Sequence, residues 1–142
     1  MEEPALTVRR ILLVDDEQAF LEAQSEILRR LGYYVAPSRN AMRALELFDE
    51  NPHEFDLVIT DEIMPGMAGS EMCRRIREVR PGIPIIIVTA GLEFPRTLGK
   101  AALCGVRQVL LKPVMKQELC RAIERAWREK RGGSRVIPLR NR

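Results

Sequence analysis

The chain alternates between short apolar runs and longer segments whose apolar residues recur every three or four positions. Continuous apolar runs at 11–14, 57–59, 85–88 and 109–111, and a short, more polar run at 33–36, predict five β-strands. Unbroken apolar runs are typical of strands buried on both faces of a parallel sheet. We therefore expect the first, third and fourth strands in its centre and the second at its edge.

Segments with helical spacing follow each of these runs. They cover 20–31, 41–48, 72–79, 98–102 and 119–127. Gly32, Asn51-Pro52, Pro81-Gly82 and Gly105 end the first four. Pro95 and Gly99 predict a fourth helix that is short, late-starting and mobile. Five strand–helix units predict an α/β fold with helices on both faces of the sheet.

The length of 142 residues suits one domain, which we place at 8–130, with a basic tail or the start of a linker at 131–142. Hydrophobic residues make up 46% of the chain and charged residues 30%, a globular balance. The net charge of +3 comes from the C-terminus, because residues 130–142 carry five basic residues and no acidic one. The domain itself is therefore close to neutral.

Several protein classes are excluded by what the sequence lacks. No apolar run approaches the roughly 18 residues of a membrane span, and the acidic start Met1–Pro4 does not resemble a signal peptide. Three separated cysteines and one histidine fit no disulfide framework, zinc site or histidine-based triad. We expect a cytoplasmic protein with no membrane partner.

Polar side chains follow four of the predicted strands. Asp15 and Asp16 follow the first strand, Asp61 the third, Thr89 the fourth and Lys112 the fifth. The carboxyl ends of parallel strands form one edge, so these side chains should converge. An all-oxygen ligand set favours Mg²⁺ over Ca²⁺ or Zn²⁺. A metal, a lysine and a hydroxyl around a carboxylate are components of phosphoryl transfer.

Four fragments then identify a family. The sequences V-D-D-E at 14–17, T-D-E-I-M-P-G-M-A-G at 60–69, V-T-A at 88–90 and L-K-P at 111–113 each adjoin a predicted strand. Together they resemble the response-regulator receiver domain, the CheY-like family of two-component signalling, over residues 8–130. The resemblance implies a flavodoxin-like, doubly wound (βα)5 fold with strand order 2-1-3-4-5.

The resemblance also implies roles for individual residues. Asp61 would accept a phosphoryl group from a histidine kinase. Asp16, Asp61 and the backbone carbonyl of Ile63 would bind Mg²⁺ directly, and Asp15 would bind it mainly through a water molecule. Such a domain is a phosphorylated switch rather than an enzyme, apart from its own phosphoryl transfer and dephosphorylation.

Thr89 and Lys112 would each contact a phosphoryl oxygen, and the bond before Pro113 would be cis. The implied partners are a histidine kinase or phosphotransfer protein, an unidentified downstream protein and, as one option, a second copy of the chain.

Two departures from the family pattern affect these expectations. Relatives usually carry Tyr or Phe where this chain has Val109, which has no ring to change rotamer on phosphorylation. The segment Gly105–Gln108 is also more basic than usual.

Ile63 and Gly91 offer no group to orient a hydrolytic water, which predicts a long-lived phosphorylated state.

Three other functions compete with the switch. Val109 favours a phosphorylation-independent interaction scaffold, which the complete Asp/Thr/Lys set opposes. A flavin- or nucleotide-binding enzyme would need a glycine-rich loop after the first strand, where Asp15 and Asp16 stand instead. Nucleic-acid binding by the tail lacks an aromatic platform and is disfavoured.

The remaining conspicuous residues have structural interpretations. We expect His53 in a solvated loop and Trp127 in the core. We expect Met64 and Met67 to pack a loop and Glu62 to be exposed beside the site.

Overall fold

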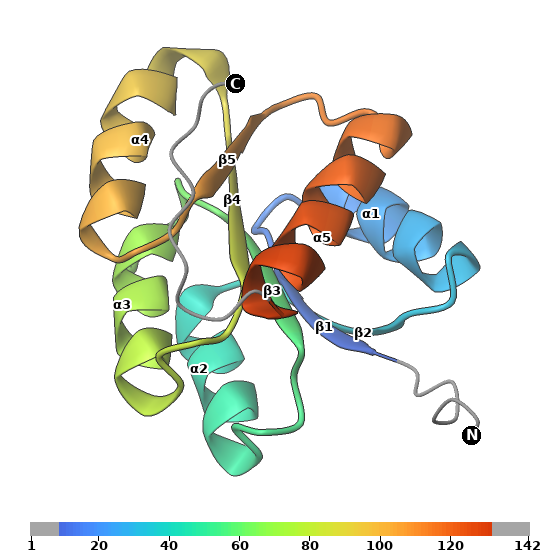
Figure 1. The fold of residues 1–142 in the computed structure, drawn as a ribbon. Coiled ribbons are helices and arrows are strands. Elements are labelled where there is room, and N and C mark those ends of the chain that lie inside the picture. Colours follow the sequence, from blue (N-terminus) through green and yellow to red (C-terminus); the bar gives the residue numbers. More distant parts are fainter. Residues whose placement is uncertain (1–8, 132–142) are drawn as a thin grey trace.

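Five parallel strands form one sheet in the order β2-β1-β3-β4-β5 (Figure 1). The computed structural model describes residues 9–131. The strands are β1 (Arg10–Val14), β2 (Tyr34–Ser38), β3 (Leu57–Asp61), β4 (Ile85–Thr89) and β5 (Gln108–Leu111). The predicted α/β fold and strand order are confirmed, with β2 at an edge.

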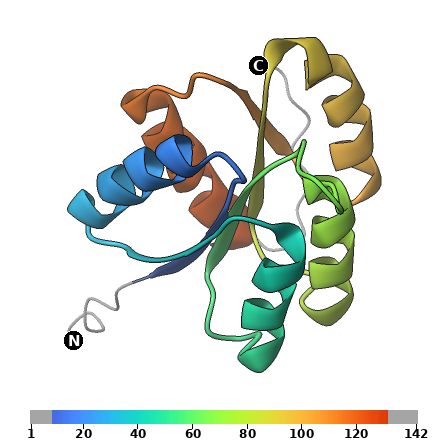
Figure 2. The ribbon, with the colours of Figure 1, turned by 180° about the vertical axis from the view of Figure 1, so that it is seen from behind.

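Helices cover both faces of the sheet. They are α1 (Gln18–Arg30), α2 (Ala41–Glu50), α3 (Gly69–Val79), α4 (Phe94–Leu103) and α5 (Lys116–Arg131). Helices α1 and α5 lie on one face, and α2, α3 and α4 lie on the other, as Figure 2 shows from behind. No helix among residues 9–131 is long and apolar enough to cross a membrane.

The unbroken apolar runs supply two cores at once, because successive strand residues point to opposite faces. In β1, Leu12 and Val14 pack towards α2, α3 and α4. Ile11 and Leu13 pack towards α1 and α5. Both faces of the central strands are therefore buried, which is why their sequences do not alternate between apolar and polar residues.

Several boundaries differ from the sequence pattern. Strand β2 begins at Tyr34 and extends to Ser38, two residues beyond the predicted end, because its full length pairs with β1. Helix α4 begins late, with Pro95 in its first turn, but its ten residues equal α2 in length. A 3₁₀ turn, Gly91–Glu93, precedes α4 and was absent from the pattern.

Three of the residues with predicted structural roles, His53, Met64 and Met67, lie as expected. His53 is exposed in a turn, Met64 is buried and Met67 is half-buried. Trp127 packs against the α1/α5 core beside Tyr33 but stays partly exposed, so it borders the core. The cysteines are free thiols. Residue 8 and the basic tail from 132 onward lie outside the described residues.

Gly69, the first residue of α3, lies directly against the last residue of β3. A Cβ atom at position 69 would overlap the backbone carbonyl oxygen of Asp61. The absence of a side chain lets α3 begin beside Asp61, and the Gly69 N–H donates to the Glu62 carbonyl at 2.9 Å.

We expect Gly69→Ala to destabilise the domain by roughly 1–3 kcal/mol, because the new methyl group must displace the Asp61 backbone. Gly99→Ala is the matched control. Nothing lies within 4 Å of a Cβ there, and alanine stabilises a helix interior by about 1 kcal/mol relative to glycine. Urea denaturation of both variants measures the difference. Equal free energies of unfolding would contradict the steric role of Gly69.

Candidate functional site

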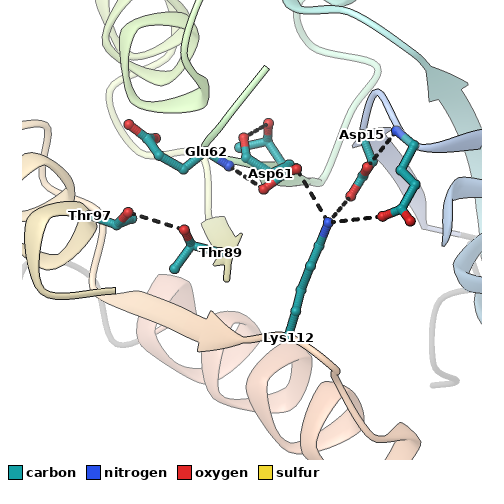
Figure 3. A network of polar contacts seen from close by, with 8 residues as sticks. Asp15, Asp61, Glu62, Thr89, Thr97 and Lys112 are labelled. Atoms are coloured by element: carbon teal, nitrogen blue, oxygen red, sulfur yellow. Dashed lines mark hydrogen bonds and ion pairs between the residues drawn. The ribbon is translucent and has the colours of Figure 1, made fainter. Parts of the chain in front are cut away.

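Four polar side chains meet at the carboxyl edge of the sheet (Figure 3). Asp15 follows β1, Asp61 ends β3, Thr89 ends β4 and Lys112 follows β5. The parallel register brings these strand ends to the same level, since Asp61 pairs with Val88 and Thr89 with Leu111. The Lys112 N–H also donates to the Thr89 carbonyl at 2.8 Å.

The Lys112 ammonium group joins the two buried carboxylates. Its Nζ lies 2.9 Å from Asp15 Oδ2 and 3.3 Å from Asp61 Oδ2, with Glu17 Oε1 at 3.8 Å. The ring of Phe20 lies below it, with its centroid 4.3 Å from Nζ. The Lys112–Pro113 peptide bond is cis, as the family resemblance implies.

Backbone amides hold the other oxygens of these carboxylates. Asp15 Oδ1 accepts from the Glu17 N–H at 2.9 Å, and Asp61 Oδ1 accepts from the Glu62 N–H at 2.8 Å. Asp15 is 2% exposed and Asp61 7% exposed. Both carboxylates are therefore oriented by the fold before any ligand arrives.

Burial and crowding change the proton affinity of the central groups. Burial, and then the negative charge of Asp15, raise the pKa of Asp61, although the Lys112 charge opposes this shift. Burial alone would lower the pKa of Lys112, but its hydrogen bond to Asp15 and the Asp61 charge raise it. The lysine therefore stays charged while ionised Asp61 is disfavoured.

Three carboxylates are arranged as a cation site. Oxygen atoms of Asp15, Asp16 and Asp61 lie within 4.8 Å of one another. Asp16 is half-buried, and its carboxylate makes no hydrogen bond or ion pair within residues 9–131. Three carboxylates, one of them without a hydrogen-bond or ion-pair partner among residues 9–131, are suitable ligands for a hard divalent cation such as Mg²⁺. Ile63 stands at the rim with its side chain 50% exposed, and a role for its carbonyl stays a prediction.

Thr89 is buried, and its hydroxyl group faces α4. Thr97 Oγ1 donates to Thr89 Oγ1 at 3.3 Å. The contact with Thr97 could not be predicted from the sequence, because a lone threonine within a helix carries no signal of a partner eight residues earlier.

The expectation that Glu62 is exposed was wrong, since it is 1% exposed. Its carboxylate accepts from the Ser70 N–H at 2.7 Å and the Ser70 hydroxyl at 2.8 Å. Lys100 of α4 lies 3.8 Å away. The free amides at the start of α3 attract a carboxylate, and the loop folds Glu62 back onto them.

Comparison with known proteins agrees with this geometry. A family model described as the response regulator receiver domain matches residues 11–124. The two-component response regulators ARR12 of Arabidopsis thaliana and ORR22 of Oryza sativa subsp. indica are 37% and 35% identical over 110 and 123 residues. These alignments cover 78% and 87% of this chain but only 18% and 17% of the relatives. This chain thus spans less than a fifth of their length.

Solved structures match over nearly their whole length. A receiver domain protein from Clostridium thermocellum aligns with a TM-score of 0.82 and 31% identity, covering 87% of this chain and 98% of that chain. A CheY-like receiver domain protein from Methanospirillum hungatei JF-1 aligns with a TM-score of 0.79 and 30% identity, covering 89% and 98%.

We expect Asp61→Asn to raise the unfolding temperature by a few degrees at neutral pH without divalent cations. The amide replaces a buried carboxylate whose ionised form the fold disfavours. A gain of about 1 kcal/mol in the free energy of unfolding raises the melting temperature of a small domain by about 2–8 °C. The protonated form of Asp61 stabilises wild type below the unfolded-state pKa, and this contribution is lost as the pH rises through the raised folded-state pKa. The advantage of the variant should therefore shrink on acidification. Thermal melts across pH measure it, and a lower melting temperature at neutral pH would contradict it.

Proposed function

The chain belongs to the response-regulator receiver family of two-component signalling, and on that premise we propose that it is a phosphoacceptor switch with Asp61 as the acceptor. The observation that carries the proposal is the Asp61 carboxylate, held between Lys112 and the Asp15–Asp16 pair. These are the charges that phosphoryl transfer to a carboxylate requires.

In this proposal an Asp61 oxygen forms a bond to phosphorus while the P–N bond of a donor phosphohistidine breaks, and the imidazole leaves with the electron pair. The Lys112 ammonium group, already beside the acceptor, attracts a phosphoryl oxygen. Asp15, Asp16, Asp61 and the Ile63 carbonyl would hold Mg²⁺, which supplies further positive charge against the phosphoryl oxygens. Thr89 would donate to another of these oxygens.

The proposed donor is a histidine kinase or a phosphotransfer protein in the cytoplasm, and the proposed receiver of the signal is a downstream protein. On this basis the chain is a signalling module whose only reactions are its own phosphorylation and dephosphorylation.

A phosphorylation-independent scaffold is the second candidate, and Val109 favours it. This side chain is half-buried against the α2/α3/α4 core and has no ring to move. The ordered acceptor site favours the switch more strongly, because a scaffold has no use for buried carboxylates that destabilise one another.

Acetyl phosphate with Mg²⁺ should add one phosphoryl group to wild type, as measured by intact-protein mass spectrometry. Asp61→Asn should add none, because its amide cannot act as the nucleophile. The control Asp49→Asn changes an exposed aspartate on α2 and should behave as wild type. Chelation of the metal should prevent the reaction. An unmodified wild type, or a modified Asp61→Asn, would reject the switch in favour of the scaffold.

The lifetime of the phosphorylated state should be prolonged by Ile63 and Gly91. Both positions are exposed at the rim, and neither offers a group that orients water. We expect Ile63→Asn and Gly91→Glu to accelerate decay about tenfold, equivalent to about 1.4 kcal/mol. Beyond its chain neighbours, nothing lies within 4 Å of a Cβ at Gly91, so a side chain can start there without a steric clash.

Decay of the phosphorylated protein at constant Mg²⁺ measures these rates. Leu92→Gln is the control, because this neighbouring side chain is almost fully exposed. Decay that is no faster in both rim variants would show that these positions do not set the lifetime.

A further inference from the structure

Two buried hydroxyl groups join the candidate site to α4. Thr89 is fully buried and Thr97 is 1% exposed, and their Oγ1 atoms lie 3.3 Å apart. A buried hydroxyl group without a partner is costly, so each threonine holds the other in place. Figure 3 shows the Thr89 hydroxyl directed at Thr97, while the Lys112 side chain points between Asp15 and Asp61.

The Thr89 oxygen atom is thus held towards α4, where it accepts from Thr97 while its own hydrogen stays free to donate. Within residues 9–131 no hydrogen bond joins Thr89 to Asp61. A threonine Oγ1 has a fixed direction in each χ1 rotamer. The proposal below requires Thr89 to change rotamer or shift its backbone when its hydroxyl group turns from Thr97 towards a phosphoryl oxygen on Asp61. Either movement breaks the contact with Thr97 or pulls α4 along.

Helix α4 is poorly anchored in other respects. Only Thr97 and Ala101 are buried among its side chains, and Leu98 and Leu103 are exposed. Its other polar link to the site is Lys100, 3.8 Å from Glu62. One of its two buried anchors is therefore the hydroxyl group that Thr89 must leave. An element with so little apolar burial changes position at low cost.

We propose that Thr97 is a positioning residue that restrains the Thr89 hydroxyl in the unphosphorylated state and transmits its release to α4. This inference rests on the proposed phosphoacceptor function. Val109 occupies the position on β5 where relatives usually have an aromatic side chain. In this protein the inference places the structural response in α4 instead.

Beryllofluoride with Mg²⁺, a non-covalent mimic of the phosphoryl group, tests the proposal. Thr97→Val removes the hydroxyl group that holds the Thr89 oxygen towards α4, at nearly constant shape. It should bind beryllofluoride about two- to tenfold more tightly, the factor expected for one net hydrogen bond. Thr97→Ser keeps the hydroxyl and should bind as wild type. Leu103→Ala, an exposed change on the same helix, should also leave the affinity unchanged.

A double-mutant cycle separates positioning from a general structural effect. In a Thr89→Ala background, Thr97→Val should no longer change the affinity, because the hydroxyl it releases is gone. An equal gain in both backgrounds would overturn the proposal, as would equal affinities of wild type and Thr97→Val.

Wild type alone supplies a test that needs no variant to fold. Beryllofluoride should shift the amide resonances of Thr97–Lys100 more than those of α2, and unchanged α4 resonances would overturn the proposal. If wild type binds no beryllofluoride at all, the phosphoacceptor function itself fails. Binding without an effect of Thr97 rejects only the coupling.

Discussion

The ammonium group of Lys112, shared by Asp15 and Asp61, is the interaction on which the site depends. Two buried carboxylates repel each other and lose hydration, and the fold tolerates both because one cation lies 2.9 and 3.3 Å away. That cation follows β5, while the carboxylates belong to β1 and β3, so the lysine crosses the end of β4. A single side chain therefore links the carboxyl end of β5 to those of β1 and β3, neither of which is a neighbour of β5 in the sheet.

The same edge connects to α4 by two polar routes. From the end of β4, Thr89 contacts Thr97, and from the loop after β3, Glu62 contacts Lys100. Glu62 is held rigidly by the Ser70 amide and hydroxyl at the start of α3. Both routes begin within one residue of a strand end at the candidate site. On the proposal, a change in charge there would reach α4 through these short chains of contacts rather than through the apolar core.

Local patterns in the sequence were sufficient to predict most of the fold. Apolar runs marked the buried strands, and Gly32 and Gly105 ended helices where the structure shows φ of +99° and +74°. The grouping of Asp61 with Lys112 followed from the rule that parallel strands end at one edge. The burial of Glu62 and the pairing of Thr89 with Thr97 depend on how loops and helices pack in space. No periodicity records such contacts, and a glutamate in a polar loop looks exposed.

The charges at the carboxyl edge of the sheet give a reason why a response to phosphorylation would appear in α4 rather than in α2, which covers the same face of the sheet. A phosphoryl group would add roughly two negative charges beside carboxylates that Lys112 only partly neutralises. The polar groups nearest the added charge must then reorient towards it or away from it. Helix α2 resists such a change because four of its side chains are buried in the core. Helix α4 buries two, and one of these is a hydroxyl group bound to the site. The weaker anchorage and the direct contact coincide in α4, so on the proposal its position would respond to the candidate site at a lower cost in packing than that of α2.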